Sequence, residues 1–169
     1  MKKSDLEHYL EVLTSFDTAM LVTLRGEEIR SRPMAIADTS PDGRLWFLTS
    51  VESGKLEEIT DSPMVNVTMQ ADSKFLSISG SAVATRDSDK IDKLWSASDN
   101  AWFPEGKDDP TIIALEIVPT YAEYWDRSGV KGFEATLKIG KSVVTREPPD
   151  LDGDVHEKLD FPDKVMGEQ

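Results

Sequence analysis

Hydroxyl and ammonium groups gather in the segment TSVESGK, residues 49–55, where a strand is predicted to give way to a helix. The start of a helix offers unpaired N–H groups and the positive end of the helix dipole. Thr49, Ser53 and Lys55 therefore predict a phosphate-binding site. The simpler interpretation is that Ser53 only caps the helix and that Lys55 is solvated. The segment is not a P-loop, because the GxxxxGK[ST] spacing is missing.

Two arginines stand in the segment IRSRPMA, residues 29–35, which is predicted to be a strand. Side chains alternate along a strand, so Arg30 and Arg32 are expected to project from the same face. Like charges side by side repel unless a bound anion or an acidic side chain lies between them. Ion pairing with one of the many carboxylates is the simpler of these two alternatives. Pro33 has no N–H to donate and predicts a strand edge or bulge that a ligand could approach.

Aromatic residues are frequent in the second half of the chain. Trp95 follows Ile91 at helical spacing and is expected in the core. Trp102, Phe103 and Pro104 fall in a segment rich in Gly, Pro and Asp, which predicts a loop. Large rings in a loop are hard to pack within one chain, so a planar ligand or a second subunit is expected to cover them.

Catalytic and metal-binding patterns are weak. His8 and His156 fall in the predicted first helix and in a polar tail, and neither has a metal-ligand spacing, so no metal site is expected. The chain contains no nucleophile-elbow motif, and no pair of carboxylates stands out. The sequence therefore identifies no catalytic residue.

Charge and composition limit the partners. The chain has 169 residues, with 32 acidic and 19 basic side chains and a net charge of −13. Such a surface repels phosphate backbones and anionic lipids, so neither nucleic acid nor a membrane is an expected partner. Without cysteine, disulfides and thiolate sites are excluded. The N-terminal residues lack the apolar core of a signal peptide, and a cytoplasmic location is expected.

The predicted elements are mostly short strands. Helices are predicted over residues 4–15, after residue 53 and from Asp87 onward. Strands are predicted over residues 18–24, 28–38, 44–50, 64–70, 74–86, 111–118 and 121–127. The last two strands are separated at Pro119-Thr120, and the strand over 74–86 is expected to bend at Gly80. The spacing lacks regular βαβ alternation and favours an antiparallel barrel with peripheral helices.

The order of the motifs resembles the pyridoxamine 5'-phosphate oxidase-like FMN-binding split barrels, and in particular their general stress protein branch. The similarity runs from the first helix to about Asp126 through RSRPMA, LWFLTSVESGK, PMVNV, FLSISGSA, WFPEGKDDP and VPTYAEYWD. It implies a mainly β fold, a six-stranded antiparallel split β-barrel with peripheral α-helices, over residues 1–130. Residues 131–169 are expected to form a C-terminal helix and an acidic tail, which either folds onto the barrel or stays mobile.

The resemblance also implies a cofactor site at the interface of a homodimer. The cofactor would be FMN, with FAD as an alternative. Trp125 would reach the flavin that is bound mainly by the other subunit. The residues that the resemblance assigns to the cofactor are Arg32, Thr49, Ser53 and Lys55 around the phosphate, with Gly54 between the last two, the backbone around Pro33-Met34 and Phe47-Leu48 along the isoalloxazine ring, and Trp125.

Departures from the family pattern argue against true pyridoxamine phosphate oxidation. Gly54-Lys55 stands where the vitamin-pathway oxidases carry Arg-Lys, and Ala37 stands where they carry a lysine. Phe75 and Ser77 replace a glutamine and an arginine, and no arginine-rich substrate signature follows Trp125. The retained phosphate residues favour flavin binding, whereas the missing substrate residues disfavour that particular substrate.

Three functions follow as hypotheses. The first is an FMN-dependent oxidoreductase of the general stress type, whose small-molecule redox substrate the sequence does not identify. The second is a non-catalytic protein that stores, senses or delivers flavin. The third is a partner-binding module without flavin, and a deazaflavin is a further alternative as cofactor.

Overall fold

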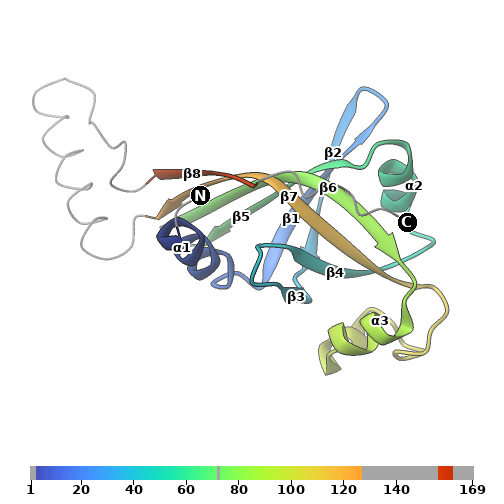
Figure 1. The fold of residues 1–169 in the computed structure, drawn as a ribbon. Coiled ribbons are helices and arrows are strands. Elements are labelled where there is room, and N and C mark those ends of the chain that lie inside the picture. The colour runs from blue at the N-terminus through green and yellow to red at the C-terminus, as the bar shows by residue number, and fades with distance from the viewer. Residues whose placement is uncertain (1–2, 72, 127–155, 162–169) are drawn as a thin grey trace, which may run out of the picture.

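The computed structural model describes residues 3–71, 73–126 and 156–161, and these residues form one curled antiparallel sheet with helices at its periphery (Figure 1). The helices are α1 (Lys3–Leu13), α2 (Gly54–Asp61), α3 (Ser88–Leu94) and the 3-10 helix η1 (Ala97–Ala101). The strands are β1 (Thr18–Arg25), β2 (Glu28–Ala35), β3 (Asp38–Thr39), β4 (Leu45–Ser50), β5 (Met64–Ala71), β6 (Lys74–Thr85), β7 (Ile112–Asp126) and β8 (His156–Asp160).

The sheet closes because its two edges are nearly continuous in the chain. The strand order is β2-β1-β5-β6-β7-β4-β3, with β8 beside β7, so β2 and β3 are the two ends. Only Ile36 and Ala37, called the seam below, separate them. The backbone N–H of Ile36 donates to the carbonyl of Asp17 at 2.9 Å, and that of Ala37 donates to the carbonyl of Trp46 at 2.8 Å. The seam thus ties both edges together, and Pro33 lies on an edge strand as predicted.

The predicted mainly β antiparallel barrel with peripheral helices is confirmed, with two short strands more than the expected six. Eight strands are present in the described residues instead of six. One addition is β3, whose two residues are too short to show a pattern in the sequence. The other is β8, whose HEKLD sequence is polar at most positions.

The core lies inside the curl of the sheet. One row of paired residues crosses five strands with side chains at most 2% exposed: Leu21, Val67, Ile78, Ala122 and Leu159. Helix α1 covers one end of this core with Tyr9, Val12 and Leu13, which are fully buried. Burying one such large apolar side chain contributes about 1.5–3 kcal/mol.

Strand β7 corrects the prediction of two strands broken at Pro119-Thr120. It is one strand of 15 residues. Pro119 lies opposite Gly80, where the pairing register with β6 shifts, so the missing N–H falls at an irregularity of the ladder. The Thr120 hydroxyl donates to the Ser79 carbonyl at 3.2 Å. The predicted bend at Gly80 is confirmed as this register shift.

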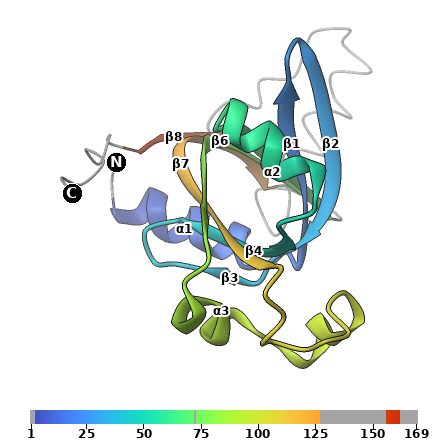
Figure 2. The same cartoon turned by 90° about the vertical axis from the view of Figure 1, so that its right-hand side faces the viewer.

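A second apolar cluster packs α3 and the following loop against β4 and β7. Figure 2 shows α3 below β4. The carboxylate of Asp87 accepts from the backbone N–H groups of Asp89 and Lys90, which confirms the predicted cap of α3. Trp95 is only partly buried at the edge of the cluster. The expectation that Phe103 needs an outside partner is wrong, because it is buried against Trp95 at 6.0 Å between ring centroids.

The C-terminal prediction is tested only over residues 156–161. Residues 127–155 and 162–169, which include the predicted helix and most of the tail, lie outside the described residues. Strand β8 pairs with β7 from Tyr121 to Trp125. His156, which was expected in a polar tail, stacks on Trp125 with ring centroids 4.8 Å apart and lies 2.6 Å from a carboxylate oxygen of Glu123. This part of the tail therefore folds onto the barrel.

Among the helices of the described residues, none combines the length and the apolar character needed to cross a bilayer.

Candidate functional site

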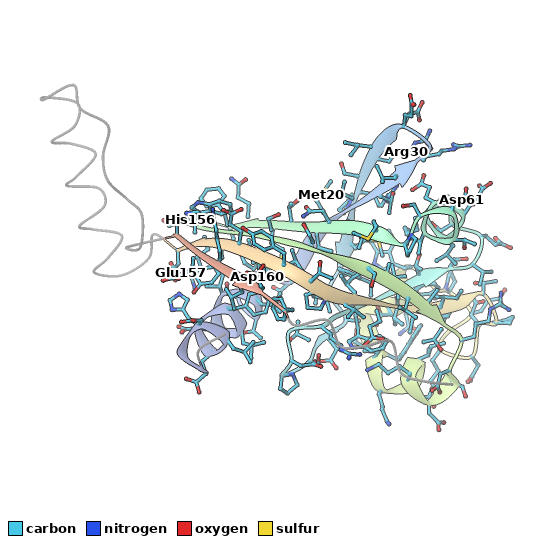
Figure 3. The ribbon with its side chains drawn as sticks, turned by 45° about the horizontal axis from the view of Figure 1, so that its top comes forward. Met20, Arg30, Asp61, His156, Glu157 and Asp160 are labelled. Carbon is cyan, nitrogen blue, oxygen red and sulfur yellow. The ribbon has the colours of Figure 1, made fainter. Side chains whose placement is uncertain are left out.

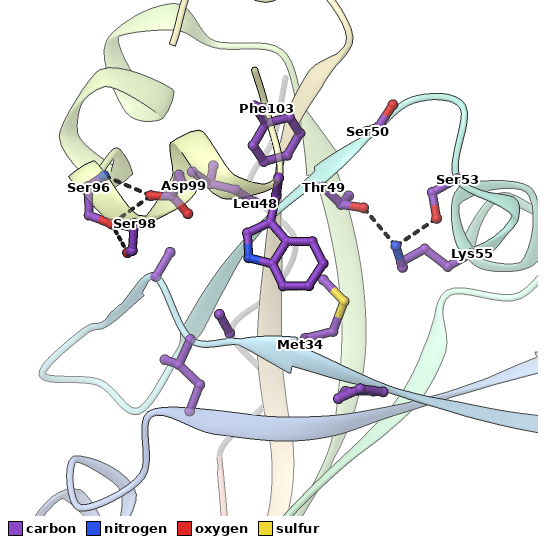
Figure 4. A pocket seen from close by; sticks show the side chains of 15 residues that line it. Met34, Leu48, Thr49, Ser50, Ser53, Lys55, Ser96, Ser98, Asp99 and Phe103 are labelled. Atoms are coloured by element: carbon purple, nitrogen blue, oxygen red, sulfur yellow. Dashed lines mark hydrogen bonds between the residues drawn. The ribbon is translucent and has the colours of Figure 1, made fainter. Parts of the chain in front are cut away.

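The lysine cradle, defined as Thr49, Ser53 and Lys55, forms where β4 ends and α2 begins. The Lys55 ammonium donates to the Thr49 hydroxyl at 2.8 Å and to the Ser53 hydroxyl at 2.6 Å (Figure 4). Ser53 occupies the N-cap position of α2, yet its side chain makes no capping hydrogen bond. The interpretation that Ser53 only caps the helix is therefore wrong.

Lys55 is not a freely solvated lysine either. Burial lowers its pKa, the nearby positive charge of Arg32 lowers it further, and the Glu58 carboxylate opposes both effects. The described hydrogen bonds of its ammonium go to two neutral hydroxyl groups. A half-buried positive charge at the positive end of a helix is an arrangement that favours a bound anion.

Arg30 and Arg32 project from the same face of β2, as predicted, and an acidic side chain lies between them. Arg32 Nη2 is 2.6 Å from Glu58 Oε2, and Arg30 Nη1 is 3.5 Å from Glu58 Oε1. Arg32 Nη1 also donates to the Thr23 hydroxyl at 2.5 Å, and this hydroxyl donates to Glu58 Oε2 at 2.5 Å. Figure 3 shows Arg30 on the β1–β2 hairpin and Asp61 on the adjacent α2. Of the two alternatives for Arg30 and Arg32, the structure therefore contains the ion pair with an acidic side chain of the same chain.

Glu58, which holds this network together, was not predicted from the sequence. Its side chain is only 6% exposed. It lies one turn after Lys55 on α2 and next to the buried Ile59, so it lies on the inward part of the helix. The helical spacing of LEEI indicates that Glu58 lies on the inward part of the helix. Composition alone, however, could not select this carboxylate among 32 acidic residues.

Replacing Glu58 with glutamine is expected to lower the free energy of unfolding by about 1.5–3 kcal/mol at neutral pH, because two partly exposed arginines lose the carboxylate that accepts their hydrogen bonds. The hydrogen bond from Thr23, and then the hydrogen bond and charge of Arg32, lower the pKa of Glu58 against the opposing effect of burial. The resulting stability is present above the ordinary value of 4.5 and is lost as pH falls through the lower folded value. Urea unfolding of both proteins should show a gap that narrows below about pH 4. A gap that is equally wide at acidic and neutral pH would contradict this role of Glu58.

A pocket of about 460 Å³ opens beside the lysine cradle. This volume lies within the usual range for small-molecule sites, about 300–1,000 Å³. The pocket is formed by the end of β2, the seam, the end of β4, the start of α2 and the loop around η1. The lining residues are Pro33, Met34, Ala35, Ile36, Ala37, Leu48, Thr49, Ser50, Ser53, Lys55, Ser96, Ser98, Asp99, Trp102 and Phe103.

Polar groups occupy opposite sides of this pocket. Figure 4 shows the lysine cradle on one side and Ser96, Ser98 and Asp99 on the other, with Met34 and Leu48 between them. Asp99 Oδ2 accepts from the backbone N–H of Ser96 at 2.7 Å and from its hydroxyl at 2.8 Å. A matching ligand has an anionic end, an apolar middle and a hydrogen-bonding end.

Six of the ten cofactor residues implied by the resemblance line the pocket: Pro33, Met34, Leu48, Thr49, Ser53 and Lys55. Phe47 has its side chain in the core, because strand alternation turns it away from the face on which Leu48 lies. Gly54 is the first residue of α2 and does not line the pocket. Arg32 belongs to the ion-pair network with Glu58.

Trp125 lies far from the pocket of its own chain. Ile113 of β7 pairs with Thr49, and Trp125 lies twelve residues further along, which corresponds to about 40 Å of strand. Trp102, by contrast, lines the pocket and is 77% exposed. An exposed aromatic ring of the same chain therefore borders the pocket.

The curled antiparallel sheet with a pocket at its seam defines a split β-barrel protein. The chain belongs to the family described as pyridoxamine 5'-phosphate oxidase like, whose model matches residues 4–150.

Several relatives of this chain are general stress proteins. General stress protein 26 of Bacillus subtilis is 31% identical over 126 residues, which cover 70% of this chain and 87% of that protein. The structure of the general stress FMN/FAD binding protein from Xanthomonas citri is similar with a TM-score of 0.65 and 29% identity, covering 76% of this chain and 92% of the other. General stress protein 26 from Bacillus anthracis shares the fold with a TM-score of 0.65 at 24% identity, covering 70% of this chain and 92% of the other.

Proposed function

We propose that this general stress-type protein binds FMN, or the related FAD, in the pocket beside the lysine cradle. The phosphate lies at Lys55, and the isoalloxazine ring lies against Met34, Leu48 and Trp102. The observation that carries the proposal is the half-buried Lys55 ammonium, which is held by two hydroxyl groups at the start of a helix. The similarity to a protein named for FMN/FAD binding supports it.

The residues present fit a phosphate in their chemistry. Lys55 supplies a charge-assisted hydrogen bond, and Ser53 and Thr49 supply hydroxyl groups beside it. The N–H groups at the start of α2 add donors at the positive end of the helix dipole. A phosphate dianion near Lys55 favours the charged ammonium and so offsets the effect of burial on its pKa.

The proposed activity is that of a flavin-dependent oxidoreductase acting on a small molecule in the cytoplasm. Bound flavin supplies the redox chemistry, while the chain binds it, orients it and excludes water. Among the described residues that line the pocket, the ionisable side chains are Lys55 and Asp99, and Asp99 is hydrogen-bonded to Ser96. This small set favours a second candidate function, a non-catalytic flavin store or sensor.

Pyridoxamine phosphate oxidation is not proposed. Ala37 lines the pocket, and this is the position where the resemblance expects a lysine in the vitamin-pathway oxidases. A methyl group there offers neither charge nor hydrogen bond to a phosphorylated substrate.

The proposal includes a homodimer in which the second copy supplies Trp125. The outer face of the sheet carries a row of paired, partly exposed side chains from Met20 through Thr68 and Ser77 to Glu123. A second row contains Phe75 and Trp125. This mix of small, polar and aromatic side chains suits a subunit interface, whose polar rim surrounds apolar contacts.

A purified apoprotein titrated with FMN tests the proposal. At 100 times its dissociation constant, FMN should raise the free energy of unfolding by about 2.7 kcal/mol, with light scattering showing a dimer. No gain in stability and no binding in the titration would contradict flavin binding, and a monomer would contradict the shared site. Anaerobic addition of NADH or NADPH then separates the two candidates. Bleaching of the yellow colour supports the oxidoreductase, whereas a bound flavin that neither donor reduces supports storage or sensing.

A further inference from the structure

Asp99 places a carboxylate on the wall of the pocket opposite the lysine cradle (Figure 4). It lies in the first turn of η1, in the connection between α3 and β7. Its Oδ2 accepts from the backbone N–H of Ser96 at 2.7 Å and from the Ser96 hydroxyl at 2.8 Å, which completes a capping box. These two hydrogen bonds hold the carboxylate at the wall of the pocket.

The capping box does not require the charge of Asp99. Glutamine serves in capping boxes as glutamate does, so the contact needs an acceptor oxygen only. Asp99 Oδ1 accepts no hydrogen bond from the described residues, and Asp99 forms no ion pair with any of them. Its side chain is only partly exposed. The charge therefore acts on whatever molecule occupies the pocket.

We infer that Asp99 shifts the preference of the pocket toward oxidised FMN and away from reduced FMN. This inference rests on the proposed function and deepens it, because it assigns control of the reduction potential to one residue of the chain. The oxidised isoalloxazine ring is neutral, whereas the ring that has taken up two electrons is largely anionic in mildly alkaline solution. A fixed charge beside the ring therefore favours one of the two forms.

The charges of the site are separated along the pocket. Lys55 belongs to the lysine cradle, and Arg32 lies near enough to lower the pKa of Lys55 further. Both positive charges thus lie at the end where the phosphate is proposed, and a phosphate dianion compensates them. Asp99 lies across the apolar middle of the pocket, where the ring is proposed, so its charge is the one that opposes an anionic ring.

The size of the effect follows from Coulomb's law. At an effective dielectric constant of about 20, two like charges about 12 Å apart repel enough to change an equilibrium constant about tenfold. One pocket of about 460 Å³ holds both groups, so we expect their separation to be no larger than this. A tenfold preference for the oxidised form lowers the two-electron reduction potential by about 30 mV.

The test compares the dissociation constants of oxidised FMN and of FMN reduced with dithionite, both measured anaerobically in mildly alkaline buffer of low ionic strength. The ratio of the two constants reports the response to the charge of the ring, because both forms share the phosphate. Asp99→Asn removes the charge and keeps an acceptor oxygen for Ser96. Asp92→Asn is the matched control, because Asp92 lies on α3 outside the pocket and pairs with Lys107 at 2.9 Å.

Asp99→Asn should shift the ratio about tenfold toward reduced FMN, which corresponds to a rise of about 30 mV in the reduction potential of the bound flavin. Asp92→Asn should keep the ratio of the wild type. An unchanged ratio in Asp99→Asn, or an equal shift in both variants, would overturn the inference.

Asp99→Glu and Asp99→Gln keep the comparison available if Asp99→Asn does not fold. These two side chains have the same shape, both serve at this position of a capping box, and only glutamate carries a charge. Asp99→Glu should stay within about threefold of the wild-type ratio, whereas Asp99→Gln should shift it about tenfold toward reduced FMN. Equal ratios in the two variants would overturn the inference. A wild type that binds neither form of FMN contradicts the proposed function instead, so the two failures are distinguishable.

Discussion

Methionine in place of Lys55 is expected to weaken FMN binding by about 1.5–3 kcal/mol, a factor of roughly 10–150 in the dissociation constant. Methionine keeps the length and the apolar contacts of the side chain but removes the ammonium that donates to Thr49 and Ser53. Calorimetric titration with FMN measures the loss. Riboflavin has no phosphate, and its affinity should change little.

Lys107→Met is the matched control for this prediction. Lys107 pairs with Asp92 on the surface at 2.9 Å and lies outside the pocket, so this variant removes the same charge from the chain at a distance. It should bind FMN like the wild type. If both variants lose the same affinity for FMN, the effect comes from the net charge of the chain and not from the position of Lys55. If Lys55→Met loses the same affinity for FMN and for riboflavin, the effect comes from contacts with the isoalloxazine ring and not with the phosphate.

Alanine in place of Gly80 is expected to lower the free energy of unfolding by roughly 2–4 kcal/mol. A Cβ atom at this position would lie 2.2 Å from the carbonyl oxygen of Val118, which is backbone and cannot rotate away. The two longest strands, β6 and β7, would have to separate at the register shift that accommodates Pro119. The urea midpoint measures the effect.

Gly54→Ala serves as the control for Gly80→Ala. No heavy atom lies within 4 Å of the Cβ that alanine would add at Gly54, and the residue begins a helix, where alanine is favoured. This variant should be as stable as the wild type or slightly more stable. Equal destabilisation by both substitutions would mean that lost glycine flexibility, and not the approach of β7, explains the Gly80 result.

The parts of the site that could be predicted from the sequence are local. Thr49, Ser53 and Lys55 lie within seven residues at the junction of a strand and a helix, so their proximity follows from the elements themselves. The paired projection of Arg30 and Arg32 follows in the same way from strand alternation. The bend at Gly80 was predictable because glycine is unusual inside a long strand.

The parts that could not be predicted depend on contacts between distant residues. Glu58 meets Arg32 across 26 positions of sequence, and any of the many carboxylates satisfies the same chemical requirement. Trp102 was expected to be covered by a planar ligand or by a second subunit, and only the fold shows that it lines a pocket together with Ile36 and Ala37 of its own chain. Strand β8 is held by backbone pairing with β7, which a mostly polar sequence such as HEKLD does not reveal.

The most direct measurement of the central claim is a crystal structure of the protein grown with FMN. The account predicts a phosphate oxygen within hydrogen-bond distance of Lys55 Nζ, the hydroxyl of Ser53 beside it, and the ring against Met34, Leu48 and Trp102. A phosphate bound away from Lys55, or a flavin bound outside this pocket, would contradict the account.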